Sequence, residues 1–325
     1  MAGGIGPADS ADSADSADSA DSADTAGVFV ASGGVRRPIG VSPRLEERSG
    51  AFGGNKWPPS DMGVDAKWDF ADFKTRFPDG SWGVYYRSLA VLGKFVQTKI
   101  EDPPHSWDNI NLKQIRDEAD VGQELKELIK LIEYRPGIMA EALAQRQNIE
   151  VYFQSLLMYS RSSHPQTFRL VEIAQRIGQF QAVYYKMKFK RARPSQLAPE
   201  LMPPIDVPGH AAYPSGHATG AYLVAHCLAE VMPATARKPA EVQLPEGGVR
   251  VPDPESTPLL RLAQRIARNR EVLGLHYRSD TLAGKILAEE SFKLMKACGS
   301  ISKIIDKSKK EWALPLPYDV EDEDE

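Results

Sequence analysis

"FRLVEIAQRIGQFQAVYYKMKF", residues 168–189, is the stretch that decides the fold class. Its apolar side chains recur every three or four positions, as at Leu170, Ala174, Ile177 and Tyr184. This spacing lines one face of a helix with apolar groups and leaves charged residues on the opposite face. We therefore predict a long amphipathic helix here.

The same periodicity recurs along the middle and the C-terminal part of the chain. Apolar stripes with charged opposite faces are found in residues 118–134, 137–160, 216–232, 259–273 and 278–301. No alternating run of β-branched residues is long enough to predict a sheet. The sequence thus predicts an all-α fold, a helical bundle, with Pro-rich interruptions at 194–214 and 233–258.

Composition divides the chain into one domain and two tails. Residues 1–64 contain an Ala-Asp-Ser repeat followed by a segment rich in Gly, Pro and Ser, and residues 313–325 end in an acidic run. Such segments have too few apolar side chains to offset the entropy lost on ordering, so we predict disordered, low-complexity tails. Residues 65–312 then form the helical domain.

Charge and hydropathy narrow the set of partners. The formal net charge is −4 and the basic residues are scattered, so nucleic acid is not expected as a partner. The most apolar stretch, residues 219–236, is interrupted by His226, Glu230 and Pro233, which argues against an integral membrane protein. The N-terminus lacks the pattern of a secretory signal. We predict a cytoplasmic protein with Cys227 and Cys298 buried and reduced.

A first candidate motif lies at the end of the long helical pattern. Lys186 and Arg193 are seven residues apart, which on a helix places them on one stripe, two turns from each other. Pro194 favours an extended backbone at Arg193 and ends the helix there. The other basic side chains of this stretch are interpreted as a solvated face: Lys188, Lys190 and Arg191.

A second motif is Pro214-Ser215-Gly216-His217, just before a helical pattern that begins near Ala218. A helix N-terminus presents free backbone N–H groups and a positive dipole end, and glycine lets an anion approach the main chain. Ser215 is placed to cap this helix or to donate to such an anion. His217 is expected in the first turn.

A third motif combines Arg270, His276 and Asp280. His276 and Asp280 are four residues apart, so on a helix the carboxylate can accept the imidazole N–H and fix its tautomer. Gly274 allows a bend that returns Arg270 to the same place.

Each motif alone has a structural explanation: surface charge, a helix cap, or a histidine with its hydrogen bonds satisfied. Together they describe a site for a tetrahedral oxyanion. The three motifs resemble those of the superfamily of type 2 phosphatidic acid phosphatases and vanadium-dependent haloperoxidases, over about residues 85–300. The resemblance implies a helical bundle with the site at its centre. Asn269 departs from the pattern, since many members have serine before this arginine.

The resemblance also implies a role for each residue. The oxyanion's nonbridging oxygens would be held by Lys186, Arg193, Arg270, Ser215 and the Gly216 N–H. His276 would form the covalent or coordinate bond, His217 would act as acid and base, and Asp280 would orient His276.

Two reactions fit this superfamily. In a haloperoxidase, His276 would be the axial ligand of vanadate, and hydrogen peroxide would oxidise a halide, with bromide or iodide favoured. In a soluble acid phosphatase, His276 would attack a small phosphomonoester to give a phosphohistidine, without a cofactor. The absence of a spanning helix and of a signal pattern favours the haloperoxidase. A helical interaction protein with idle motifs is a third reading, and the sequence leaves a homodimer open.

His210 separates the first two readings. It lies seven positions before His217, where the resemblance implies histidine in bromoperoxidases and phenylalanine in chloroperoxidases. A second imidazole there can hydrogen-bond a bound oxygen. The alternative is a loop histidine exposed to water.

Overall fold

The computed structural model describes residues 28–30, 36–38, 82–102, 104–112, 118–233, 242–243, 249–250 and 257–313. Residues 83–313 fall in one compact unit. In the other unit, strands β1 (Val28–Val30) and β2 (Arg36–Pro38) pair antiparallel. Most of the predicted tails, 1–64 and 313–325, and the predicted boundary at residue 65 lie outside the described residues.

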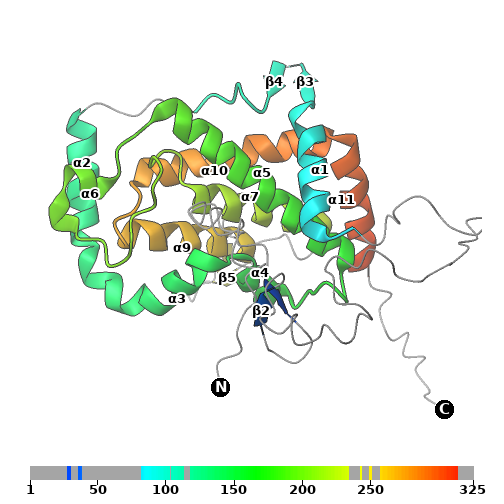
Figure 1. Ribbon diagram of the computed structural model, residues 1–325, viewed down its shortest axis with the longest axis horizontal. Helices are drawn as coiled ribbons and strands as arrows, with labels where there is room; N and C mark the ends of the chain where they lie inside the picture. Colours follow the sequence, from blue (N-terminus) through cyan, green and yellow to red (C-terminus); the bar gives the residue numbers. More distant parts are fainter. Residues whose placement is uncertain are drawn as a thin grey trace, which may run out of the picture. The chain divides into compact units, whose positions relative to one another are not determined.

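Helices dominate the unit that contains residues 83–313, which confirms the all-α prediction (Figure 1). They are α1 (Val84–Val96), α2 (Glu118–Lys130), α3 (Arg135–Gln147), α4 (Glu150–Leu157), α5 (Pro165–Phe189), α6 (Pro194–Leu197), α7 (Gly216–Val231), α9 (Pro258–Val272), α10 (Arg278–Ala297) and α11 (Gly299–Trp312). The described strands here form two short antiparallel pairs: β3 (Lys99–Glu101) with β4 (Pro104–Ser106), and β5 (Val242–Gln243) with β6 (Val249–Arg250).

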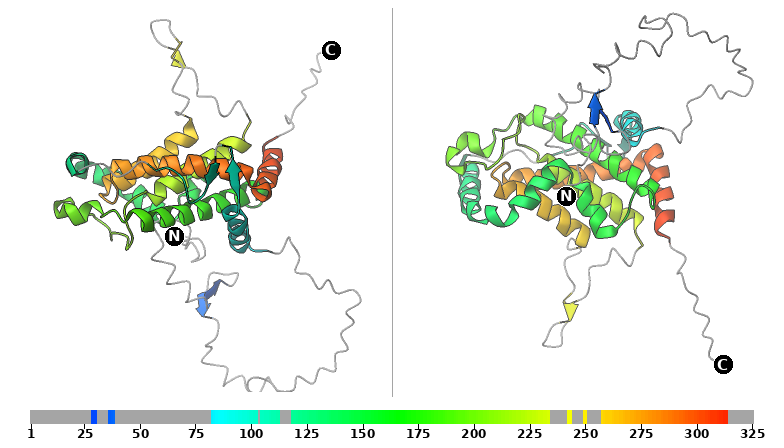
Figure 2. Two further views of the ribbon diagram at one scale, coloured as in Figure 1. Left: turned by 90° about the horizontal axis from the view of Figure 1, so that it is seen from above. Right: turned by 60° about the horizontal axis from the view of Figure 1, so that its bottom comes forward.

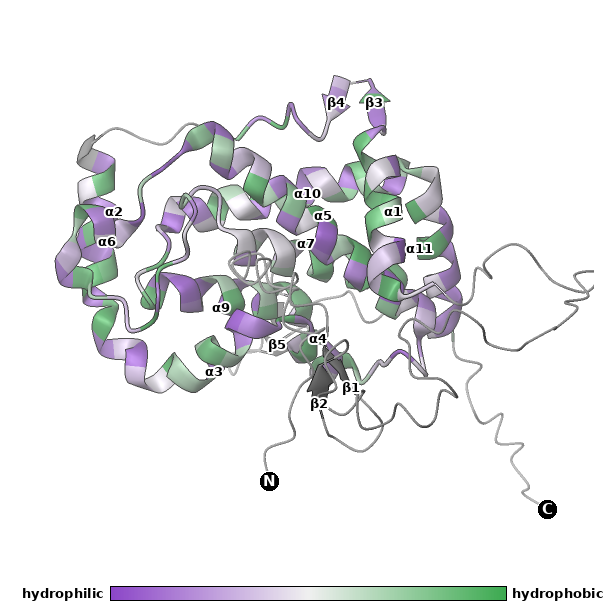
Figure 3. Ribbon diagram, viewed as in Figure 1, coloured by the Kyte–Doolittle hydropathy of each residue, from purple (hydrophilic) through white to green (hydrophobic). Residues whose placement is uncertain are grey.

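Helix α5 forms where the periodicity predicts it. Leu170, Ala174 and Ile177 are fully buried, and the Tyr184 ring packs edge-on against Trp107 at 4.7 Å between centroids. Hydrophilic and hydrophobic residues alternate around this helix and around α1 and α11 (Figure 3). The apolar side of each helix therefore faces the core.

Helix α7 is the centre of the bundle and packs against α5, α9 and α10. Figure 2 shows α5 and α10 running lengthwise in this unit. Glycines permit the close contacts: a Cβ on Gly284 of α10 would lie 2.8 Å from the Ala218 Cβ and 2.8 Å from the Ser215 carbonyl oxygen. The backbones of α7 and α10 can approach this closely because Gly284 has no side chain.

The structure divides two of the predicted helices. Residues 137–160 form α3 and α4, because the Asn148 Oδ1 accepts the Glu150 N–H at 2.7 Å and replaces the helical bonding pattern. The stretch 278–301 is likewise interrupted at Cys298, between α10 and α11. Cys227 and Cys298 are both buried and free, as predicted. Of the described helices, none has the length and apolar character needed to span a membrane.

Candidate active site

Lys186 and Arg193 both reach the candidate site, but they do not share a helical stripe. Helix α5 ends at Phe189, and Lys190 adopts a left-handed conformation with φ of 50°. The prediction of a helix running to Arg193 is therefore wrong, although Arg193 is extended (φ −69°, ψ 151°) before Pro194, as expected. Both cationic side chains are only 2% exposed.

The two cations hold the loop that leads into α7. The Lys186 Nζ donates to the carbonyl oxygens of Ala211 at 2.8 Å and Ala212 at 3.2 Å. The Arg193 Nε donates to the carbonyl oxygen of His210 at 2.9 Å. A carbonyl oxygen carries no formal charge, so these bonds position the cations without neutralising them.

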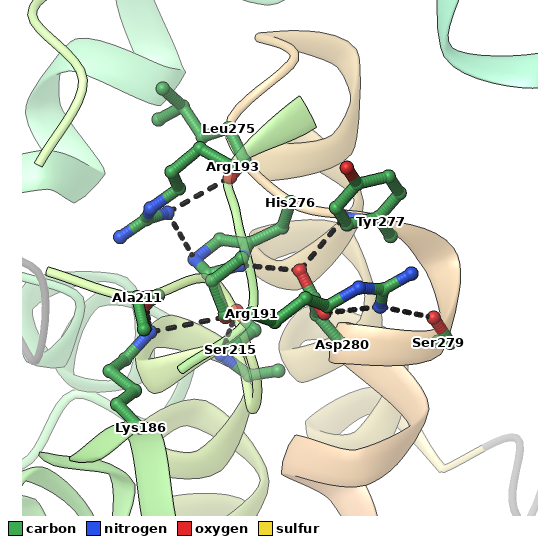
Figure 4. A network of polar contacts seen from close by, with 12 residues as sticks. Lys186, Arg191, Arg193, Ala211, Ser215, Leu275, His276, Tyr277, Ser279 and Asp280 are labelled. Carbon is green, nitrogen blue, oxygen red and sulfur yellow. Dashed lines mark hydrogen bonds and ion pairs between the residues drawn. The ribbon is translucent and has the colours of Figure 1, made fainter. Parts of the chain in front are cut away.

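His276 lies between a carboxylate and a guanidinium (Figure 4). Its Nδ1 is 3.1 Å from the Asp280 Oδ2, and its Nε2 is 3.1 Å from the Arg193 Nη1. An ionised carboxylate can only accept and a guanidinium can only donate, so the proton belongs on Nδ1 and the lone pair on Nε2. The imidazole thus presents its nucleophilic nitrogen beside a buried cation.

The predicted His276–Asp280 pair forms, but not along one helix. Helix α10 begins at Arg278, so His276 precedes it and Asp280 lies in its first turn. The Asp280 Oδ2 also accepts the Tyr277 N–H at 3.0 Å. The pair was expected one turn apart on a single helix. Instead, His276 lies just before the first residue of α10 and contacts Asp280 in its first turn.

Asp280 is kept ionised by its neighbours. Complete burial raises the pKa of its carboxyl, but the hydrogen bond from His276, the charge of Arg191 and the Tyr277 N–H outweigh burial. The net effect lowers the pKa below its ordinary value. An ionised Asp280 is the form that fixes the His276 tautomer.

Arg191 corrects the interpretation of a solvated basic face. Lys188 and Lys190 are exposed, but Arg191 is buried and its Nη1 lies 2.7 Å from the Asp280 Oδ1. Its guanidinium also stacks 3.7 Å from the centre of the Tyr277 ring. No sequence pattern distinguishes Arg191 from its neighbours, because apolar periodicity does not reveal that the helix ends before Lys190.

Glu124 of α2 is a second residue that the sequence reasoning missed. Its Oε2 pairs with the Arg191 Nη2 at 2.9 Å, and its Oε1 accepts the Ser279 N–H at 2.6 Å. Glu124 thereby caps the N-terminus of α10 and links it to Arg191. No local pattern marks Glu124, since its partners are 67 and 155 positions away.

The second motif begins α7 as predicted. Ser215 is the N-cap, and its Oγ accepts the Ala218 N–H at 3.3 Å. Gly216 is the first residue of the helix, and the Ser215 N–H donates to the Asp280 carbonyl oxygen at 3.0 Å. The turn thus joins the start of α7 to the start of α10, with Ser215 beside the His276 network (Figure 4).

His217 and Arg270 are buried and held by the last turns of α3. The His217 Nε2 is 3.0 Å from the Gln145 carbonyl oxygen, to which it donates, and the Arg270 Nη2 donates to the Ala142 carbonyl oxygen. Gly274 has a φ of +76°, the predicted bend after α9. Each of these two residues therefore has a side-chain hydrogen bond to α3.

Asn269, the departure from the superfamily pattern, serves the same region. Its Nδ2 donates to the Gln145 Oε1 at 2.9 Å, and the Gln145 Nε2 donates to the Glu141 Oε1 at 2.7 Å. Asn269 therefore fixes the end of α3 that holds His217.

His210 bridges this site to a surface cavity. Its Nδ1 accepts from the Arg193 Nη2 at 2.8 Å and also lies 3.2 Å from the Ala211 carbonyl oxygen. One nitrogen cannot accept and donate at once, and the shorter, charge-assisted bond from Arg193 decides its role as an acceptor. His210 is half-buried. It lines a cavity of about 840 Å³ together with Lys186 and Arg193. The apolar part of the cavity wall comes from Val183, Met187 and Val207.

Within the part of the chain that the structure describes, no group of three or more His, Cys, Asp or Glu side chains could hold a metal cation. Comparison with protein-family models and with curated proteins finds no match to this chain.

Proposed function

We propose that this site binds a tetrahedral oxyanion through His276 and that the protein is a vanadium-dependent haloperoxidase. The observation that carries the proposal is the pair of contacts of His276, from Nδ1 to Asp280 and from Nε2 to Arg193, which assigns the lone pair to Nε2. A neutral imidazole nitrogen next to buried cations suits a bond to the central atom of an oxyanion.

The donor set fits vanadate. His276 Nε2 would hold vanadate, and Lys186, Arg193 and the N-terminus of α7 would supply positive charge to its oxygens. Vanadate, when bound, supplies the activation of hydrogen peroxide toward a halide. Asp280 holds the Nδ1 proton throughout, which keeps Nε2 basic.

His210 favours the haloperoxidase with bromide or iodide. It touches Arg193 and lines the cavity from which peroxide and halide would enter. Its ring can therefore exchange hydrogen bonds with an oxygen held at Arg193.

A direct test measures peroxide-dependent bromination of a phenolic dye by metal-free protein, with and without orthovanadate. We expect bromination only with vanadate, and loss of it in His276→Ala. The matched control is His164→Ala, which replaces a histidine at the start of α5 that lies outside the site. Bromination that is independent of vanadate, or that survives in His276→Ala, would refute the proposal.

An acid phosphatase is the second candidate, because the open, partly basic cavity beside Arg193 has room for the organic part of a phosphomonoester. In that case His276 Nε2 attacks phosphorus, the ester bond breaks, and the alkoxide leaves with a proton from His217. Water then cleaves the phosphohistidine. Release of phosphate from an aryl phosphate, inhibited by vanadate and without bromination, would select this candidate.

A further inference from the structure

A second cavity is lined mainly by residues of α9 and α10. It has a volume of about 430 Å³, within the range of small-ligand sites. Tyr222 of α7 contributes to its wall. Its polar lining includes Arg261, Arg268 and Glu271 of α9 and Arg278, Thr281 and Lys285 of α10.

The two sites are built from adjacent residues that point in different directions. Arg270 contacts α3, while the next residue, Glu271, lines the second cavity. Asp280 contacts His276, while the next residue, Thr281, lines the second cavity. The second cavity is therefore distinct from the oxyanion site.

Two residues that line this cavity each have one buried polar atom without a hydrogen-bond partner among the described residues. Glu271 is 0% exposed, its Oε2 pairs with Arg268, and its Oε1 has no hydrogen-bond partner among the described residues. Thr281 is 5% exposed, and within the same part of the chain its Oγ1 also lacks a partner. A buried carboxylate oxygen and a buried hydroxyl without partners are unfavourable, so a bound group that supplies hydrogen bonds would be stabilised here.

The charge of the cavity selects an anion. Four cationic side chains line it against one carboxylate: Arg261, Arg268, Arg278 and Lys285, opposed by Glu271. The Lys285 Nζ also lies 5.9 Å from the centre of the Tyr222 ring, which holds it at the cavity. A ligand that satisfies the lining therefore combines an anionic group with hydroxyl donors.

We propose that this cavity binds a sugar phosphate. The phosphate contacts the arginines and Lys285, and hydroxyl groups of the sugar donate to the Glu271 Oε1 and pair with the Thr281 Oγ1. Bare phosphate would pair with the cationic side chains but would leave Glu271 and Thr281 without hydrogen-bond partners. A neutral sugar would pair with Glu271 and Thr281 but would leave the cationic side chains without an anion.

The test is calorimetric titration of the full chain with the phosphonate analogue of glucose 6-phosphate, whose C–P bond resists hydrolysis. Methylphosphonate serves as the bare anion. Lys285→Ala is compared with Lys293→Ala, a lysine on the same helix that pairs with Glu290 outside the cavity. We expect Lys285→Ala to weaken binding of the sugar phosphonate roughly tenfold, and Lys293→Ala by less than about twofold.

Thr281→Val separates a ligand contact from a structural role. Valine has nearly the same shape and removes an unpartnered hydroxyl, so the variant should fold at least as stably as the wild type. We expect this variant to bind the sugar phosphonate several-fold more weakly than the wild type and to bind methylphosphonate with the same affinity. Equal binding by Lys285→Ala and Lys293→Ala, or a Thr281→Val variant that binds the sugar phosphonate like the wild type, would overturn the proposal. Because neither ligand is turned over and Lys285 and Thr281 line only the second of the two cavities, the comparison between variants does not depend on the activity of His276.

Discussion

At His276, two neighbours with fixed hydrogen-bonding roles decide where the imidazole lone pair lies. Asp280 accepts from Nδ1, and Arg193 donates to Nε2. Asp280 is in turn held by Arg191 and by the Tyr277 N–H. The tautomer and orientation of His276 therefore depend on Arg191 and the Tyr277 N–H, which hold Asp280 in place.

The lowered pKa of Asp280 predicts a pH dependence of stability. A carboxyl with a folded-state pKa below its ordinary 3.8 stabilises the folded protein above that pH, and this contribution is lost as pH falls through the folded-state pKa. We expect the free energy of unfolding, from urea titrations between about pH 6 and pH 3, to fall more steeply in the wild type than in Asp280→Asn. Parallel pH profiles would contradict this.

Replacing Arg191 should destabilise the folded protein, because Arg191 pairs with both Asp280 and Glu124. In Arg191→Met the Asp280 and Glu124 carboxylates lose their shared cation, and breaking a buried ion pair in this way destabilises by about 3–5 kcal/mol. Urea unfolding measures the loss. Lys188→Met, an exposed lysine of the same stretch, is the control and should change stability by less than about 1 kcal/mol. Similar losses in both variants would mean that Arg191 contributes no more than a surface charge.

At the scale of elements, the starts of α7 and α10 determine the site. Ser215 and Asp280 lie in these two starts and are joined by a backbone hydrogen bond of 3.0 Å. Gly284 of α10 allows this approach, because it faces Ala218 and Ser215 at the beginning of α7. Packing of the two helices and geometry of the site are therefore coupled.

Gly284→Ala tests this coupling. The added methyl group would lie within 2.8 Å of α7 atoms, so we expect a loss of stability. Overpacking of this kind typically costs about 1–3 kcal/mol. Gly93→Ala in α1 is the matched control, since a Cβ there meets nothing within 4 Å. It should stabilise by about 0.5–1 kcal/mol through helix propensity. Thermal unfolding of both variants measures the change in stability. A Gly284→Ala variant that is as stable as Gly93→Ala would show that α10 can move away from α7 to accommodate the methyl group.

The sequence predicted the helices better than it predicted how the site residues meet. Apolar periodicity located α5, α7 and α9, although α7 is buried almost all round at the centre of the bundle. The Lys186–Arg193 and His276–Asp280 pairs were each assigned to one helix, whereas the chain leaves helical geometry between their members. Backbone turns at Lys190 and before Arg278 depend on tertiary contacts, which periodicity does not contain. Glu124 could not be predicted for the same reason, because its contacts with Arg191 and Ser279 are tertiary.

At the scale of the molecule, the main hydrophobic core and the site occupy the same helices. The buried residues of that core run from Val91 to Ile305, and α5, α7, α9 and α10 contribute both to it and to the site. A substitution that disturbs the packing of these helices is therefore expected to disturb the site as well.

A shortened chain of residues 65–312 tests the predicted domain. It keeps every buried residue of the core that the structure describes, so its free energy of unfolding should lie within about 1 kcal/mol of the full chain. Urea titration of both chains measures this. A large loss would show that one of the removed segments packs on the bundle.

The most direct test of the central claim is equilibrium dialysis of the full chain against orthovanadate, with vanadium counted per chain. We predict one more bound vanadium per chain in the wild type and in His164→Ala than in His276→Ala, whose circular dichroism is unchanged. Vanadium bound equally by His276→Ala would contradict the assignment of His276 as the residue that bonds the oxyanion.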